Sequence, residues 1–354
     1  MLRPLLRRSN FKPSQLRALA TATDPTVQAT PPHHNNRVRI VEVGPRDGLQ
    51  NEKKAIPLQT KLQLIERLAG TGLQDIEAGS FVAPKWVPQM ADSDSILSHI
   101  LATPPASTNR MRYSFLAPNM KGFENAASIL DQASTDRSSE DAGDPLIEIS
   151  VFAAATESFS QKNLNCDIAT SLERFRPVVQ GARAKGLRVR AYISVVLGCP
   201  FEGYDVDPKK VAEIATDLLE MGADEIALGD TTGMGTAPRT SELLRAMQAA
   251  GVRTEDIAMH FHDTYGQALV NTAVSLEHGI RTFDSSVGGL GGCPYSPGAT
   301  GNVSTEDMVY FVESLGMDCG DVDLEALSDV GQWISREIGK ENASSVGKAL
   351  LGRR

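Results

Sequence analysis

The sequence predicts a closed (β/α)8 barrel followed by a C-terminal helical extension. From Val38 onward, short β-branched or apolar runs alternate with longer amphipathic runs, which is typical of βα units around a parallel sheet. Eight short runs can be counted, the number that closes such a barrel. An open, doubly wound sheet is the alternative. Against it, no GxGxxG turn follows the first run, where a dinucleotide-binding sheet usually has one.

The eight expected strands are short, and a helical pattern follows each of them. The strands span 39–43, 75–78, 112–116, 146–151, 188–195, 225–228, 257–261 and 282–287. Segments such as LQTKLQLIERLAG and DPKKVAEIATDLLEMG carry apolar residues at the spacing of one helix face. We therefore expect the catalytic barrel over residues 37–316.

Two segments fall outside this alternation. Residues 131–145 (DQASTDRSSEDAGDP) are rich in Ser and Asp, so they are expected to form a solvated surface insertion between the third helix and the fourth strand. Residues 317–354 contain the amphipathic pattern LEALSDVGQWISREIG, which predicts a helical extension packed on the barrel, followed by a tail.

Residues 1–36 have the composition of a mitochondrial transit peptide and linker. Arginines and a lysine are interleaved with leucines, and no acidic residue precedes Asp24. Residues 24–36 are rich in Pro and Asn, as linkers often are. A disordered basic tail is the alternative. The transit-peptide interpretation places the mature protein in the mitochondrial matrix.

Composition argues against several classes of partner. With 354 residues, 41% of them hydrophobic, the chain can close a large core. A formal net charge of −9 gives no cationic surface for nucleic acid, and no apolar run approaches the roughly 20 residues of a membrane span. The four cysteines are widely spaced and include no CxxC pair, which favours a reducing compartment.

Polar residues collect where the expected strands end. Arg46 and Asp47 follow the first strand, Glu77 ends the second and Asp230 follows the sixth. Because the carboxyl ends of barrel strands open onto one mouth, we expect these side chains to share a site. Glu77 and Asp230 could also simply cap loops, but their place at the mouth favours an active-site role.

A divalent metal site is predicted around His260 and His262. Separated by one residue on a strand, the two histidines project to the same face. The pair alone would suit a hydrogen-bond network equally well. Asp47 adds a carboxylate oxygen and Asn302 an amide oxygen, and such a mixed nitrogen and oxygen set suits Mg²⁺ or Mn²⁺.

Cys293 and Arg46 are the other candidates for chemistry. Cys293 lies in a glycine-rich segment that could bend over a ligand, and a thiol there can deliver a proton. The alternative is a buried cysteine with a purely structural role. Arg46 precedes the predicted ligand Asp47, so it is expected to stabilise a developing enolate oxygen rather than form a surface salt bridge.

Four segments together carry a specific resemblance to the hydroxymethylglutaryl-CoA lyases. They are VGPRDGLQNE (43–52), SFVAPKWVPQMAD (80–92), HFHDTYGQALVNT (260–272) and GGLGGCPYSPGATGN (288–302). The two histidines and the Arg-Asp pair also fit a wider group of barrel enzymes with an Asp-Arg-Glu-type metal site. The cysteine segment and SFVAPKWVPQMAD fit the lyases. The resemblance covers about residues 38–315.

The resemblance implies cleavage of (S)-3-hydroxy-3-methylglutaryl-CoA to acetyl-CoA and acetoacetate, a reaction of leucine catabolism and ketone-body formation. It also implies a homodimer, an acyl-CoA substrate and a divalent cation as the one cofactor. In this scheme the cation ligands are Asp47, His260, His262 and Asn302.

The resemblance assigns further roles around the cation. His260, helped by Asp47 or Asp230, would remove the hydroxyl proton, and Cys293 would protonate the enolate carbon. Arg46 would stabilise the thioester oxygen. The supporting and substrate-contacting residues would be Glu77, Glu306, Ser80, Asn165 and Tyr192.

Rival functions remain on the same barrel. An acetyl-CoA-dependent synthase acting on a 2-oxo acid, of the isopropylmalate or homocitrate type, or a metal-dependent aldolase would not need Cys293. A catalytically inactive scaffold is disfavoured because every predicted metal and acid/base position holds a competent residue. A Schiff-base aldolase would need a lysine inside a strand, and none of the expected strands has one.

Overall fold

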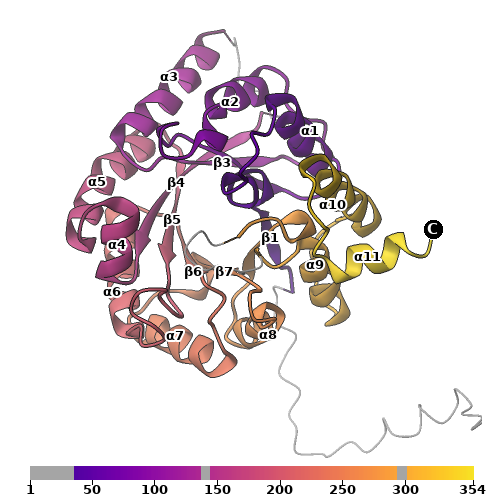
Figure 1. Cartoon of the computed structure of the whole chain (residues 1–354). Coiled ribbons are helices and arrows are strands. Elements are labelled where there is room, and N and C mark those ends of the chain that lie inside the picture. The colour runs from indigo at the N-terminus through magenta and orange to yellow at the C-terminus, as the bar shows by residue number, and fades with distance from the viewer. Residues whose placement is uncertain (1–35, 137–143, 293–300) are drawn as a thin grey trace, which may run out of the picture. The chain divides into compact units, whose positions relative to one another are not determined.

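The computed structural model describes residues 36–136, 144–292 and 301–354. In this part of the chain, eight parallel strands follow one another around a closed barrel, with β8 paired to β1 (Figure 1). The strands are β1 (Arg39–Glu42), β2 (Asp75–Ser80), β3 (Arg112–Leu116), β4 (Leu146–Ala154), β5 (Arg188–Ser194), β6 (Glu225–Asp230), β7 (Ile257–Phe261) and β8 (Thr282–Ser285). The predicted (β/α)8 barrel is confirmed.

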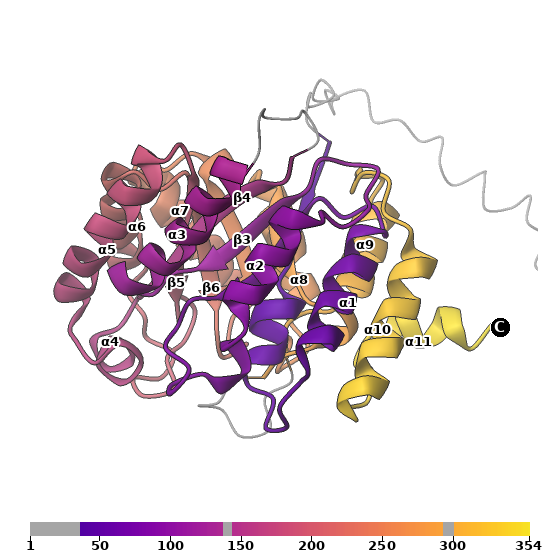
Figure 2. The same ribbon diagram turned by 90° about the horizontal axis from the view of Figure 1, so that it is seen from above.

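The helices surround the strands, as Figure 1 shows. Those that follow strands β1 to β8 are α1 (Leu58–Ala69), α2 (Ser93–Ala102), α3 (Met120–Asp136), α4 (Glu157–Leu164), α5 (Ile168–Ala184), α6 (Pro208–Met221), α7 (Ala237–Ala249), α8 (Ala268–Glu277) and α9 (Thr305–Ser314). Two more, α10 (Leu324–Ile338) and α11 (Ser345–Leu351), lie on the side of the barrel opposite α5 (Figure 2).

Helix α6 shows how the sequence sets these elements. The Asp207 side chain accepts a hydrogen bond from the Lys209 amide and caps the helix, and Pro208 occupies the first helical position. Gly222 ends the helix with φ at +118°, a conformation that a side chain would disfavour. Between these signals the buried residues recur with helical spacing, so one face of the helix packs on the barrel.

Two different interiors hold the barrel together. Apolar side chains fill the layer between strands and helices. The inside of the barrel instead carries ion pairs, because Arg39 on β1 contacts Glu225 on β6, and these strands are not neighbours. Buried charges need such partners, since an unpaired one is costly in a low-dielectric interior. These buried ion pairs adjoin the candidate site at the carboxyl ends of the strands.

Three strands end at residues other than the expected ones. β8 stops at Ser285 instead of Val287, because Gly288 has φ at +64° and begins a tight turn. β6 runs on to Asp230, which is therefore the last residue of its strand. β4 is longer than expected by residues 152–154.

Several predicted segments fall wholly or partly outside the described residues. Residues 131–136 of the expected insertion continue α3, and residues 137–143 are not described. The predicted transit segment, apart from Asn36, is also outside the described part. Across the described ranges, each helix is too short or too polar to span a membrane.

Gly331 joins the C-terminal extension to the barrel. A Cβ at this position of α10 would lie 2.1 Å from Oε1 of Glu306 and 3.2 Å from the Gly288 nitrogen. Glu306 is fully buried, and its carboxylate accepts hydrogen bonds from the Gly288 N–H, so it has little freedom to move away. Close packing of this kind requires glycine at residue 331.

Gly331→Ala is therefore expected to destabilise the fold by about 2 kcal/mol, as overpacking typically does. Alanine normally stabilises a helix interior relative to glycine, so the steric clash has to cost more free energy than this substitution usually gains. Thermal unfolding measures the effect. Gly70→Ala is the matched control, because its nearest neighbouring atom is 3.4 Å from the added Cβ. A Gly331→Ala protein as stable as the parent would contradict this account.

Candidate active site

The turn after β1 presents Arg46 and Asp47. Residues 44–48 form a π-helical turn in which the Val43 carbonyl accepts hydrogen bonds from the N–H groups of Arg46, Asp47 and Gly48. A Cβ at Gly48 would lie 2.8 Å from Oγ of Ser286, so glycine lets the turn approach the end of β8 closely. The local sequence GPRDG thus directs two charged side chains toward the barrel mouth.

Asp47, His260 and His262 lie together. One candidate ligand atom from each residue falls within 4.8 Å of the others. Nε2 of His260 and Nε2 of His262 are both 3.9 Å from Oδ2 of Asp47. The histidines come from β7 and the residue just after it, as their alternation on a strand predicts. This is a possible metal site.

Asn302 completes the donor set. Its Nδ2 donates to Oδ2 of Asp47 at 2.8 Å and to the Leu290 carbonyl at 3.1 Å. Its Oδ1 is buried and has no hydrogen-bond partner among the described residues. An orphaned amide oxygen beside two imidazoles and a carboxylate fits a divalent cation that accepts mixed nitrogen and oxygen ligands.

The electrostatics favour the deprotonated forms of Asp47 and His262. Burial alone would raise the pKa of Asp47, but the charges of Arg46 and the two histidines outweigh it and lower that pKa to about 2. Burial lowers the pKa of His262 to about 4, so its imidazole is neutral at physiological pH. Neutral imidazole and ionised carboxylate are the forms that bind metal. For His260, burial lowers the pKa, but the hydrogen bond and charge of Asp284 outweigh it and raise the pKa overall.

Arg46 is clamped by two carboxylates. Its Nε donates to Oε2 of Glu77 at 2.7 Å, and its Nη1 lies 2.8 Å from Oδ1 of Asp47. The Tyr192 hydroxyl donates to the same Glu77 oxygen at 3.0 Å, and its ring lies under the guanidinium, 5.3 Å from centroid to Cζ. The side chain of Arg46 is therefore held in one orientation before any ligand arrives.

The HMGL-like family pattern matches residues 37–334, which is most of the chain. The chain belongs to the HMGL-like family.

Relatives of this HMGL-like protein are similar over nearly their whole length. A Pseudomonas aeruginosa protein named 3-hydroxy-3-isohexenylglutaryl-CoA/hydroxy-methylglutaryl-CoA lyase is 52% identical over 90% of this chain and 98% of its own. The mitochondrial hydroxymethylglutaryl-CoA lyase of Rattus norvegicus is 46% identical, covering 95% and 94%. The crystal structure of a Pseudomonas aeruginosa hydroxymethylglutaryl-CoA lyase superposes with a TM-score of 0.81 at 49% identity, covering 90% and 99%.

Asp230 lies at the end of β6 in this HMGL-like barrel. Its Oδ2 accepts a hydrogen bond from the Gly235 N–H at 3.0 Å, whereas its Oδ1 is buried without a partner in the described part of the chain. Burial raises the pKa of Asp230 to about 7. A carboxyl group with such a pKa can take or give a proton near neutral pH.

The remaining predicted residues divide by location. Tyr192 joins the cluster of Arg46 and Glu77. The hydroxyl of Ser80 accepts from the Val82 N–H, and Asn165 ends α4 with φ at 53°. Within the described ranges, neither Ser80 nor Asn165 hydrogen-bonds to a candidate metal ligand. Cys293 lies outside the described residues.

Glu306 supports the turn that begins the glycine-rich segment. Both of its carboxylate oxygens accept from the Gly288 N–H, at 2.9 and 3.1 Å. Burial raises the pKa of Glu306 to about 8. Its contact is therefore with the backbone that leads toward Cys293 and Asn302, and not directly with the candidate ligands.

Three residues around the site were missed by sequence analysis. Gln50 donates to Oδ1 of Asp47 at 2.9 Å, which leaves Oδ2 facing the histidines. Asp284 contacts Nδ1 of His260 at 3.0 Å, and Arg190 contacts Asp284 at 2.5 Å. The available signal was a charged residue inside each of two short strands, RVRAYIS and TFDS.

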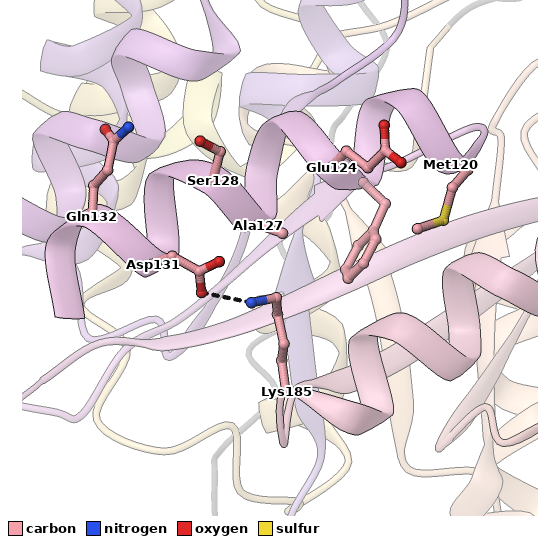
Figure 3. A pocket seen from close by; sticks show the side chains of 8 residues that line it. Met120, Glu124, Ala127, Ser128, Asp131, Gln132 and Lys185 are labelled. Carbon is pink, nitrogen blue, oxygen red and sulfur yellow. Dashed lines mark hydrogen bonds and ion pairs between the residues drawn. The ribbon is translucent and has the colours of Figure 1, made fainter. Parts of the chain in front are cut away.

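A separate hollow lies outside the barrel, along α3. Figure 3 shows Lys185, just after α5, facing Asp131 of α3, with a nitrogen to oxygen distance of 2.5 Å. Met120, Phe123 and Ala127 supply the apolar part of its lining. None of the predicted site residues lines this hollow, so it is not the candidate active site.

Proposed function

We propose that this chain is a hydroxymethylglutaryl-CoA lyase that cleaves (S)-3-hydroxy-3-methylglutaryl-CoA to acetyl-CoA and acetoacetate. The observation that carries the proposal is similarity to proteins of that name over nearly the whole length of both chains. The cluster at the barrel mouth supplies groups that the reaction requires. These groups are a candidate cation site, a guanidinium held in one orientation and a carboxyl group with a pKa of about 7.

Asp47, His260, His262 and Asn302 would hold a divalent cation, Mg²⁺ or Mn²⁺. Their support is the close approach of the ligand atoms and the orphaned Oδ1 of Asn302. When bound, the cation lowers the pKa of the substrate's tertiary hydroxyl and orients it. The mixture of nitrogen and oxygen donors is the basis for proposing these two ions.

Asp230 is the base that these observations favour. Cleavage begins when the proton on the C3 hydroxyl is removed. The oxygen then forms a carbonyl, and the electron pair of the C2–C3 bond moves to C2. Asp47, with its pKa near 2, is too weak a base, whereas Asp230 has a pKa near 7 and an unpartnered oxygen. His260, the other candidate base, lies on the neighbouring strand, in register with Gly229.

Arg46 and Cys293 would complete the reaction. The electron pair left on C2 delocalises onto the thioester oxygen, where the guanidinium of Arg46 stabilises the developing negative charge. A proton from the Cys293 thiol to C2 then gives acetyl-CoA. Ser80, Asn165 and Tyr192 remain proposed contacts to the acyl portion, with Tyr192 in place beside Arg46.

Acetoacetate formation tests the proposed function. Purified protein lacking residues 1–36 is mixed with 3-hydroxy-3-methylglutaryl-CoA and Mg²⁺, with EDTA in a parallel reaction and Cys293→Ala as the variant. We expect turnover that EDTA abolishes and that the cysteine variant loses by about 100-fold or more, the usual contribution of a positioned acid. CoA release from acetyl-CoA and a 2-oxo acid, without acetoacetate formation, would favour a condensing synthase instead.

Location and assembly are further parts of the proposal. The basic N-terminal segment supports import into the mitochondrial matrix, although relatives include both bacterial and mitochondrial proteins. We also infer a homodimer from the family resemblance. A C-terminally tagged full chain found outside mitochondria would contradict the first point, and a monomer mass by light scattering would contradict the second.

A further inference from the structure

Asp284 lies directly across from His260. The two residues are paired in the register of β7 and β8, and both are buried. Oδ2 of Asp284 is 3.0 Å from Nδ1 of His260, while Nε2 of the same ring faces Oδ2 of Asp47 at 3.9 Å. One side of the imidazole is therefore held by a carboxylate, and the other side points into the candidate metal site.

Asp284 is itself fixed by Arg190. Nη2 of Arg190 lies 2.5 Å from Oδ1 of Asp284, and the arginine side chain is 1% exposed. Nε of Arg190 lies 2.9 Å from Oε1 of Glu225, and its Nη1 donates to the Tyr192 hydroxyl at 3.1 Å. Nη1 and Nη2 of Arg190 are hydrogen-bonded, and Nε forms an ion pair with Glu225 without hydrogen-bond geometry. These three contacts hold the guanidinium, and with it the carboxylate of Asp284, in place.

The second histidine offers an internal contrast. Nδ1 of His262 is buried and has no hydrogen-bond partner among the described residues. Its ring orientation is therefore set by packing, whereas that of His260 is set by a specific acceptor. A carboxylate that accepts from Nδ1–H leaves the lone pair on Nε2 free, which is the tautomer that can bind a cation through Nε2.

We propose that Asp284, held by Arg190, is a positioning residue that selects the Nδ1–H tautomer of His260 and aims Nε2 at the cation. This inference rests on the proposed metal site. The charged barrel interior would then help to order the candidate active site. Arg190 also donates to the Tyr192 hydroxyl, which in turn donates to Glu77. The two arms of the network end on a candidate ligand and on Arg46.

Asp284→Asn is the sharpest variant because it keeps the shape and removes one acceptor. The amide oxygen would turn to Arg190, which is the stronger donor, and the amide N–H groups would face His260. Nδ1 then becomes the acceptor, and the proton moves to Nε2, the wrong tautomer for a ligand. We expect Mn²⁺ to bind about 10- to 100-fold more weakly, the usual loss when a ligand's supporting partner is removed.

Glu225→Gln is the matched control. Glu225 is a buried carboxylate on the other side of Arg190 and makes no contact with His260 among the described residues. Its isosteric neutralisation disturbs the same network without touching the imidazole. We expect it to lower thermal stability but to leave the Mn²⁺ dissociation constant within about threefold of the parent value, since it is not a supporting partner of a ligand.

The experiment measures free Mn²⁺ by electron paramagnetic resonance for the full chain and both variants. ¹⁵N NMR of histidine-labelled, metal-free protein reports which ring nitrogen of His260 carries the proton. We expect Nδ1–H in the parent and Nε2–H in Asp284→Asn. Parent protein with Nε2–H would overturn the inference whether or not Asp284→Asn folds. Equal Mn²⁺ affinity in folded Asp284→Asn protein would overturn it as well. Parent protein that binds no Mn²⁺ would overturn the proposed metal site as well.

Discussion

Arg46→Gln is expected to lower kcat by about 100- to 1000-fold, the usual loss when a donor to a developing oxyanion is removed. The guanidinium is buried and held by Glu77 and Asp47, so it needs no reorganisation as charge develops on the substrate. Substrate affinity is expected to change less than kcat, because the interaction strengthens only as the enolate forms. Steady-state kinetics with 3-hydroxy-3-methylglutaryl-CoA measure both quantities.

Structural damage has to be separated from this chemical loss. Removing Arg46 leaves Glu77 buried without its cationic partner, which is destabilising in itself. The double variant Arg46→Gln with Glu77→Gln replaces the ion pair by a neutral one. We expect it to recover much of the thermal stability and none of the activity. A single Arg46→Gln variant with near-normal kcat, or a double variant that regains activity, would show that Arg46 does not act on the substrate.

The barrel and the candidate metal site could be predicted from local patterns. The alternation of strand and helix periods fixes eight βα units, and the rule that strand ends share one mouth brings Asp47 to His260 and His262. Both steps use only spacing along the chain. They do not require knowledge of which side chains meet across the barrel.

Contacts across the barrel could not be predicted in this way. Arg190 and Asp284 form an ion pair, but they lie on β5 and β8, which are not neighbouring strands. Strand periodicity gives the face on which each side chain lies and does not show that the two residues meet. The approach of Gly331 to Glu306 is equally remote, since it joins two helices through the packing of the extension. The expected end of β8 was wrong because the positive φ of Gly288 begins a turn there, whereas β4 and β6 continue beyond their expected ends.

His262→Ala is expected to remove metal-dependent activity at micromolar Mn²⁺. It deletes a proposed ligand, so the Mn²⁺ affinity should fall by more than the roughly 10- to 100-fold that loss of a supporting partner causes. His262 is a better choice than His260 for this test. Among the described residues, Nδ1 of His262 has no hydrogen-bond partner, so its removal leaves no buried acceptor unpaired. His278→Ala is the control: this histidine bonds to Ser241 outside the cluster and should leave Mn²⁺ binding unchanged.

Restoring activity with excess metal distinguishes a lost ligand from a collapsed site. If His262 only contributes to cation affinity, millimolar Mn²⁺ should partly restore turnover in His262→Ala, because Asp47, His260 and Asn302 still provide donors. EDTA-treated parent protein should recover on addition of Mn²⁺ at much lower concentration. Unchanged Mn²⁺ affinity in His262→Ala would remove this residue from the ligand set and would leave its burial beside Asp47 to be explained by packing alone.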